Sequence, residues 1–192
     1  PGEATNPTSD TFLLDATGRI ARNALTAGPV VRILAAGGCT EDAMADGPLN
    51  DPDRLRRMVA GELPPPGVAV TVGFTLVSAG EGRAVVRMQA GPQHHNPMGT
   101  VHGGILCDLA DAAMGYSMAS TLKDGESFTT LEMKANFLKP VWDGLLVAKG
   151  RVVKRTRLTS LVEADVQDES GSLVARASST CLVLHGQHAA GR

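Results

Sequence analysis

The densest group of side chains able to do chemistry lies in residues 94–111. It reads His94-His95-Asn96-Pro97-Met98-Gly99-Thr100-Val101-His102-Gly103-Gly104, with Asp111 seven residues further on. Imidazole groups can donate or accept protons, and a carboxylate can act as a general base or as a nucleophile. Paired glycines let a ligand approach the backbone because they have no Cβ. This segment is therefore the first candidate for a catalytic or binding site.

The glycine pair lies where a helix is expected to begin. Apolar residues then recur at helical spacing, which predicts a helix over 105–122. Gly103 and Gly104 would occupy its first turn, where backbone N–H groups are free and the helix dipole is positive. Such a turn can hold an anion, or a carbonyl that is becoming an oxyanion.

Asp111 follows two helical turns later, on a helix that is otherwise almost entirely apolar. We expect so apolar a helix to be buried, and a buried carboxylate is costly unless it has partners or a task. Asp108 lies three residues earlier, on a neighbouring part of the same face. Two alternatives remain for Asp108. Its charge raises the pKa of Asp111 in a shared cleft, or it faces water near the helix start and favours the dipole there.

Strand patterns on both sides of this helix define the fold class. Two β-branched runs precede the helix and four strands follow it, at 68–78, 83–90, 127–138, 145–154, 161–167 and 173–184. A sheet must bury one face, and the apolar helix is the natural partner. The sequence therefore predicts an α+β fold in which a curved antiparallel sheet of about six strands wraps around one long central helix.

The first fifty residues are predicted to form an N-terminal extension, partly flexible. It begins with a polar, turn-rich tail, includes a short helix over 21–34, and leads into a linker over 37–51. The main domain is predicted over 51–192. It starts with a helix over 51–62 that has Asp51 as its N-cap and Pro52 in its first turn, and prolines 64–66 end it.

Composition argues against several classes of protein. The formal net charge of −2 provides no global basic field, so nucleic acid is not an expected partner. Cys39, Cys107 and Cys181 form neither a CxxC pair nor a zinc spacing, so no metal is expected and the compartment is predicted to be reducing. There is no bilayer-spanning apolar run and no signal-peptide pattern, so no membrane is expected and a cytoplasmic location is predicted.

The run from Asn96 to Gly104 resembles the signature of hotdog-fold thioesterases of the phenylacetate-degradation (PaaI-like) type. That signature is Asn-x-x-Gly-x-x-His-Gly-Gly, followed by an Asp on the central helix, which is Asp111 here. The similarity continues from Thr129 through Pro140 and covers roughly residues 64–184. The resemblance implies a hotdog fold with the N-terminal helical extension added, and hydrolysis of an acyl-CoA thioester to free acid and CoA without a cofactor.

The resemblance also implies a role for each matching residue. The Gly103 N–H would polarise the thioester carbonyl, and Asp111 would be the general base or nucleophile. Asn96 would help to hold the carbonyl or the water, Thr130 would orient the water, and His102 would contact the thioester end of the ligand. The remaining predicted substrate-binding residues are Gly104, Lys139, Arg155 and Arg157, the last three as cations for the CoA phosphates.

Family sites lie between subunits, so the resemblance implies that Asp111 and Gly103 of different chains serve one site. A homodimer or a dimer of dimers, with acyl-CoA as the substrate, is therefore expected. Two other functions remain open. One is a non-catalytic acyl-CoA binding protein. The other is a hotdog hydratase or dehydratase; those enzymes resemble each other in an Asp and a His five positions apart, and none of the five histidines here has an Asp five residues before it.

Overall fold

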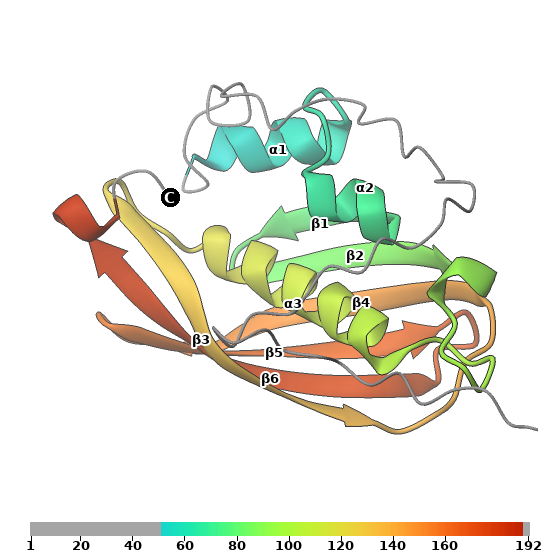
Figure 1. Ribbon diagram of the computed structural model, residues 1–192. Coiled ribbons are helices and arrows are strands. Elements are labelled where there is room, and N and C mark those ends of the chain that lie inside the picture. Colours follow the sequence, from blue (N-terminus) through green and yellow to red (C-terminus); the bar gives the residue numbers. More distant parts are fainter. Residues whose placement is uncertain (1–50, 190–192) are drawn as a thin grey trace, which may run out of the picture. The chain divides into compact units, whose positions relative to one another are not determined.

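Six strands form one curved antiparallel sheet in the computed structural model, which describes residues 51–189 (Figure 1). In chain order the strands are β1 (Phe74–Gly80), β2 (Arg83–Ala90), β3 (Glu126–Phe137), β4 (Gly144–Arg155), β5 (Thr159–Asp168) and β6 (Leu173–His185). They lie side by side in the order β1-β2-β4-β5-β6-β3, so β1 and β3 are the two edges. This confirms the predicted α+β fold. The predicted extension over 1–50 lies outside the described residues.

Helix α3 (Gly103–Ala119) lies across one face of this sheet and contacts all six strands (Figure 1). The facing side chains come from alternate positions of the strands, as the period of a pleated strand requires. On β2, for example, the buried residues are Ala84, Val86, Met88 and Ala90. Each large side chain removed from water in this way contributes roughly 1.5–3 kcal/mol. The core between helix and sheet therefore fixes where α3 lies.

The helix comes closest to the sheet at Gly150 of β4. A Cβ added to Gly150 would lie 2.2 Å from the carbonyl oxygen of Ala113 and 2.6 Å from Oγ of Ser117. Ser117 itself is fully buried and donates its hydroxyl to the same Ala113 carbonyl at 2.7 Å. Only glycine leaves room for this approach. The depth at which α3 lies on the sheet thus depends on one residue of β4.

Helix α3 buries only one side against the sheet, which corrects the expectation that it is buried all round. Its eight buried residues are Leu106, Leu109, Ala110, Ala113, Met114, Ser117, Met118 and Ala119. On the side away from the sheet, Asp108 and Asp111 are exposed, and the small residues Gly104, Ala112 and Gly115 are half-buried. The apolar composition of α3 therefore includes small residues that the described part of the chain leaves partly exposed.

A short helix, α2 (Gly67–Val72), replaces the beginning of the strand predicted over 68–78. Pro66 precedes it, and Gly73 ends it with a φ of 82°, in the left-handed region. Ala69 and Val72, three residues apart, face the core. The prediction was wrong because burial of one helical face outweighed the strand preference of the valines.

The leading helix α1 (Pro52–Ala60) is confirmed. The carboxylate of Asp51 accepts a hydrogen bond from the Asp53 N–H at 2.9 Å, as an N-cap should. The helix ends at Gly61, in the left-handed region at φ 73°, three residues before the prolines predicted to stop it. Both α1 and α2 contact β1 (Figure 1). Among the described residues, no helix is both long and apolar enough to span a membrane.

The edge strand β3 does not alternate regularly between buried and exposed side chains. Glu132, Lys134 and Asn136 are exposed on one face, whereas Thr130 is in register with the buried Cys181 of β6 and lies on the other face. Leu131 and Phe137 are 57% and 55% exposed. A β-bulge between Thr130 and Glu132 puts Leu131 out of register with β6. Strand β3 therefore presents apolar side chains at an unpaired edge.

Candidate active site

The first turn of α3 offers an N–H group to a ligand. His102 is the N-cap, and its Nδ1 accepts a hydrogen bond from the Gly104 N–H at 2.8 Å. In the described part of the chain, the Gly103 N–H has no hydrogen-bond partner. It lies at the positive end of the α3 dipole, beside an exposed imidazole. An oxygen carrying partial negative charge could bind there.

The loop that leads into α3 is held by Asn96. Its Oδ1 accepts hydrogen bonds from the N–H groups of Met98 at 2.8 Å and Thr100 at 3.3 Å, and its Nδ2 donates to Oγ1 of Thr100 at 2.9 Å. Both polar atoms are therefore engaged within the loop. Asn96 positions the backbone before the helix, whereas its predicted contact with a carbonyl or a water is not part of this arrangement.

His94 and His95 also hold this loop in place. The buried His94 accepts a hydrogen bond from the Gly91 N–H at Nδ1, at 3.1 Å, and its Nε2 lies 3.0 Å from the Val72 carbonyl. His95 makes an isolated β-bridge with Val101. The N–H of Val101 in turn donates to the carbonyl of Val141 at 2.7 Å. These contacts fix the direction in which the chain enters α3.

Asp111 lies on the exposed side of α3, and its environment changes its acidity. Desolvation by the surrounding protein, and secondarily the charge of Asp108, raise the pKa of the Asp111 carboxyl. Water still reaches the side chain in the single chain, so the desolvation is partial. A carboxylate with a raised pKa is a stronger base than an ordinary one. The hypothesis that Asp108 acts on Asp111 is supported in direction, although both side chains are exposed.

Thr130 lies on the same side of the molecule as Asp111. Thr130 is the register partner of Cys181 on β6. Burial raises the pKa of the Cys181 thiol, hydrogen bonding to Thr130 and Ser179 lowers it, and the charge of Asp111 raises it further. We call Asp111 and Thr130 together one half-site.

The second half-site, made of Asn96, His102 and Gly103, is separate from the first. Asp111 comes eight residues after Gly103 on α3, a rise of about 12 Å along the axis. Reacting atoms must come within roughly 3–3.5 Å of each other. One carbonyl therefore cannot be bound at Gly103 and attacked from Asp111 of the same helix. The structure brings the predicted catalytic residues together in two groups, not one.

Cys107, between the two half-sites, does not supply a nucleophile. Burial, followed by the charges of Asp108 and Asp111, raises the pKa of its thiol. A raised pKa leaves little thiolate at neutral pH, and the thiolate is the reactive form. This agrees with the interpretation of Cys107 as a small packed residue.

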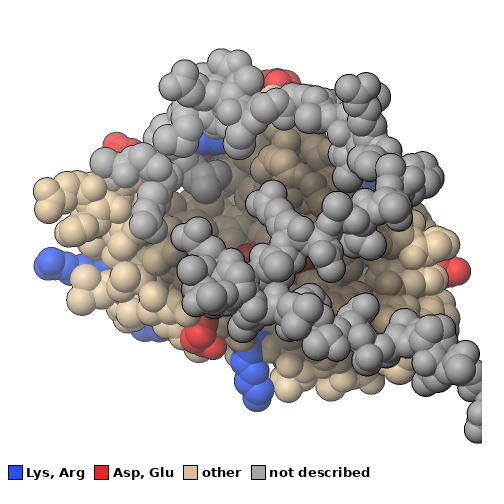
Figure 2. Space-filling view, viewed as in Figure 1, with Lys and Arg blue, Asp and Glu red and all other residues tan. Residues whose placement is uncertain are grey.

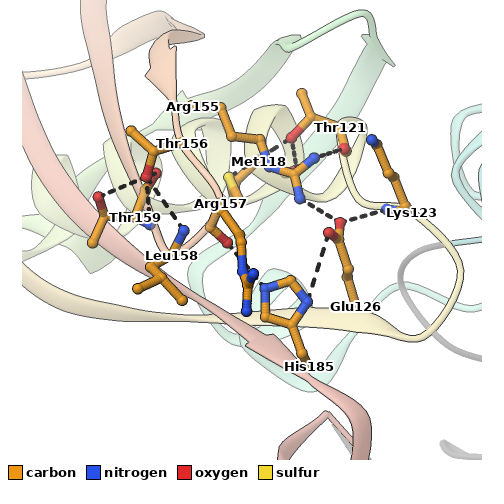
Figure 3. A network of polar contacts seen from close by, with 10 residues as sticks. All are labelled: Met118, Thr121, Lys123, Glu126, Arg155, Thr156, Arg157, Leu158, Thr159 and His185. Carbon is orange, nitrogen blue, oxygen red and sulfur yellow. Dashed lines mark hydrogen bonds and ion pairs between the residues drawn. The ribbon is translucent and has the colours of Figure 1, made fainter.

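Arg155 is engaged inside the chain, at the far end of α3 (Figure 3). Its guanidinium donates to the Thr121 carbonyl and forms an ion pair with Glu126. Glu126 also accepts a hydrogen bond from the Lys123 N–H at 2.8 Å, and its other oxygen lies 3.8 Å from Nδ1 of His185. Binding a CoA phosphate through Arg155 would require breaking this network.

The other two predicted cations differ from Arg155. Lys139 lies two residues after the end of β3 and forms an ion pair with Asp168. The side chain of Arg157 is exposed, and its backbone carbonyl lies 3.0 Å from Nε2 of His185 (Figure 3). Lys139 and the Arg155–Arg157 pair therefore do not form one patch within the chain. On the face shown in Figure 2, the visible Lys and Arg side chains are likewise scattered.

Sequence reasoning missed Phe137 as a neighbour of the site. A Cβ added to Gly103 would lie 3.0 Å from Cζ, 3.2 Å from Cε2 and 3.4 Å from Cε1 of the Phe137 ring. The ring therefore lies against Gly103 on α3. No short-range sequence pattern links two residues so far apart in the chain.

Comparison with known proteins points to thioesterases. The family model described as the thioesterase superfamily matches residues 98–175. A 1,4-dihydroxy-2-naphthoyl-CoA hydrolase of Listeria monocytogenes is 31% identical over 108 residues, which cover 56% of this chain and 88% of the relative. Human acyl-coenzyme A thioesterase 13 is 27% identical over 109 residues, which cover 56% of this chain and 77% of the relative.

Solved structures agree. A putative thioesterase of Ralstonia eutropha, related to phenylacetic acid degradation, superimposes with a TM-score of 0.61 at 34% identity, covering 67% of this chain and 98% of that one. The E. coli PaaI protein of the phenylacetic acid degradation operon gives 0.61 at 25% identity, covering 69% and 94%. The chain therefore belongs to the thioesterase superfamily, with the hotdog fold. Within that superfamily it is similar to the phenylacetate-degradation type.

Proposed function

We propose that this chain hydrolyses the thioester bond of an acyl-CoA, releasing a free acid and CoA. The observation that carries the proposal is the Gly103 N–H at the start of α3, which has no partner within residues 51–189, on a helix that also exposes Asp111. An N–H aimed at a carbonyl oxygen stabilises the charge that develops there during attack. The names of the relatives, a naphthoyl-CoA hydrolase and an acyl-coenzyme A thioesterase, support the same chemistry.

In this mechanism the carbonyl oxygen binds at Gly103 and a water attacks the carbonyl carbon. Asp111 takes a proton from that water, with Thr130 orienting it, and the C–S bond breaks as the CoA sulfur leaves and gains a proton. Direct attack by the Asp111 carboxylate is the other route, and it uses the same residue. His102 contacts the thioester end of the ligand beside Gly104. Lys139 and Arg157 would meet the CoA phosphates, and Arg155 would join them only by leaving Glu126.

The site is completed by a second copy of the chain. Because about 12 Å of helix separates Gly103 from Asp111, each copy supplies one half-site to each active site. The half-buried small residues on the side of α3 away from the sheet leave room for another subunit to approach. The proposed assembly is a homodimer or a dimer of dimers.

The test is release of free thiol from a panel of acyl-CoAs by the purified full chain. The panel runs from short aliphatic to long-chain and aryl acyl groups. Asp111→Asn and Asp111→Ala should lower kcat by at least ~10²-fold, about 2.7 kcal/mol in the barrier, while acyl-CoA binding survives. Asp124→Asn, at an exposed position after α3, is the matched control and should leave kcat unchanged.

Near-wild-type kcat in Asp111→Ala would refute the assignment of Asp111 as the general base or nucleophile. Tight acyl-CoA binding without thiol release from any member of the panel would favour the non-catalytic binding protein instead.

A further inference from the structure

We propose that Phe137 determines which acyl groups reach the Gly103 N–H, an inference that rests on the proposed thioester hydrolysis. The role follows from where the ring lies. The phenyl group occupies the space that a side chain on residue 103 would fill, with Cζ 3.0 Å from that Cβ position. A ligand that hydrogen-bonds to Gly103 must therefore pass beside this ring.

The ring is held in place by backbone pairing at the end of an edge strand. Phe137 is in register with Ala175 of β6, and the next residue, Leu138, donates its N–H to the Val174 carbonyl at 2.8 Å. One side of the Phe137 ring contacts Gly103, while 55% of the residue remains exposed. One side of the ring thus packs on the helix start and the other is open.

Its exposure distinguishes Phe137 from most aromatic residues of the described chain. Phe74 is buried, and Tyr116 and Phe128 are half-buried, whereas Phe137 and Trp142 are each more than half exposed. Single exposed apolar residues are common on protein surfaces, so exposure alone assigns no role. Phe137 differs because its ring also lies against Gly103, where the thioester carbonyl is proposed to bind.

The chemistry of the ring favours the acyl side of the thioester. The pantetheine arm of CoA carries amides, which lose hydrogen bonds when they are pressed on an apolar surface. An acyl chain has no such cost, and it gains from burial against the ring. The ring fills the Cβ side of Gly103, so it narrows the space beside a carbonyl bound at the Gly103 N–H. Bulk next to the carbonyl carbon should therefore collide with Phe137.

The test compares acyl-CoAs that differ only next to the carbonyl, such as straight-chain, α-branched and benzoyl thioesters. In Phe137→Ala, kcat/KM for the α-branched and benzoyl substrates should rise at least ~10-fold relative to the straight-chain substrate, a change of about 1.4 kcal/mol in selectivity. Phe137→Leu should give an intermediate ratio. Leu138→Ala, an equally exposed apolar neighbour, should leave the ratio unchanged.

Three results would overturn the proposal. One is an equal change for all acyl groups. Another is a change that follows the thiol, seen by replacing CoA with N-acetylcysteamine on the same acyl group. The third is dissociation of the assembly in Phe137→Ala, by sedimentation, that accounts for the altered rates, since the ring would then be a subunit contact.

Dissociation constants for the same acyl-CoAs separate this inference from the proposed function. If the wild type releases no thiol from any substrate, hydrolysis is refuted. The selectivity of Phe137 must then show as a shift in relative affinity between straight and branched ligands, and unshifted affinities would refute it too.

Discussion

Asp108 and Asp111 place two like charges on one exposed side of α3, and the charge of Asp108 disfavours ionisation of Asp111. For Asp111 the effect adds to desolvation, and both raise its pKa. The carboxylate is the reactive form of a general base, so a raised pKa moves the acidic limb of the pH–rate profile upward. Asp108 would thereby adjust the pH range of the reaction without touching substrate.

Removing that charge gives a prediction with a definite sign. In Asp108→Asn the pKa of Asp111 falls, so the acidic limb of kcat/KM should move to lower pH while the plateau is largely kept. The measurement is a pH–rate profile of both proteins, with Asp124→Asn as the control that should not shift. An unmoved limb would leave Asp108 a surface residue, and a collapsed plateau would place it in the catalytic machinery.

Gly103 allows the N–H to be separated from the space around it. Proline is well tolerated at the first position of a helix, and His102 before it has the extended φ and ψ of −64° and 137° that proline requires. Gly103→Pro removes the N–H and should lower kcat by about 10²–10³-fold.

Gly103→Ala is the matched control, because it keeps the N–H and adds only a Cβ against the movable end of Phe137. It should retain much more activity than the proline variant. Equal losses in the two variants would mean that crowding, not the missing hydrogen bond, limits the reaction.

For single residues, the sequence predicted the contacts that are made by near neighbours in the chain. The glycine pair predicted the helix start because glycine and a free N–H belong to the same turn, and His102 caps it. The partners of Arg155 could not be predicted. Thr121 and Glu126 lie 34 and 29 residues away, and only the folded sheet brings them to the guanidinium.

At the scale of elements, the contact of α3 with β4 sets the position of the catalytic helix. Gly150→Ala would put a Cβ 2.2 Å from the Ala113 carbonyl, a rigid backbone atom, so helix and sheet must separate. We predict a loss of roughly 1–3 kcal/mol in the free energy of unfolding, as in overpacked cores.

Chemical denaturation of Gly80→Ala provides the comparison. Gly80 is also a strand glycine, but an added Cβ there meets nothing within 4 Å. Its free energy of unfolding should stay within about 0.5 kcal/mol of wild type. Wild-type stability in Gly150→Ala would show that α3 can shift without cost.

Sequence patterns predicted well those elements in which the period of the apolar residues matches the observed burial of their side chains. Strand β2 was predicted with its observed bounds because its β-branched and apolar run fits a strand, and its buried residues alternate with more exposed ones. Residues 67–72 misled the prediction because valine favours strands, while Pro66 and Gly73 enclose a helical turn. On β3, the bulge beside Leu131 has no local signal, because it depends on pairing with β6.

The molecule as a whole leaves several surfaces open. Among the described residues, strands β1 and β3 are the sheet edges, and Leu131 is exposed on β3. The side of α3 away from the sheet carries exposed and half-buried residues as well. We therefore predict at least a homodimer by analytical sedimentation at micromolar concentration. A monomer with full activity would contradict this.

The central claim is that Gly103 of one chain and Asp111 of another act on the same thioester. It can be tested by mixing two inactive variants, Asp111→Asn and Gly103→Pro, through co-expression or joint refolding. If the site lies between subunits, each mixed dimer has one intact site, so a random mixture should recover about a quarter of wild-type thiol release. Each variant assembled alone should stay near background. If both residues act within one chain, no intact site can form, and a mixture no more active than its separate components would contradict the account.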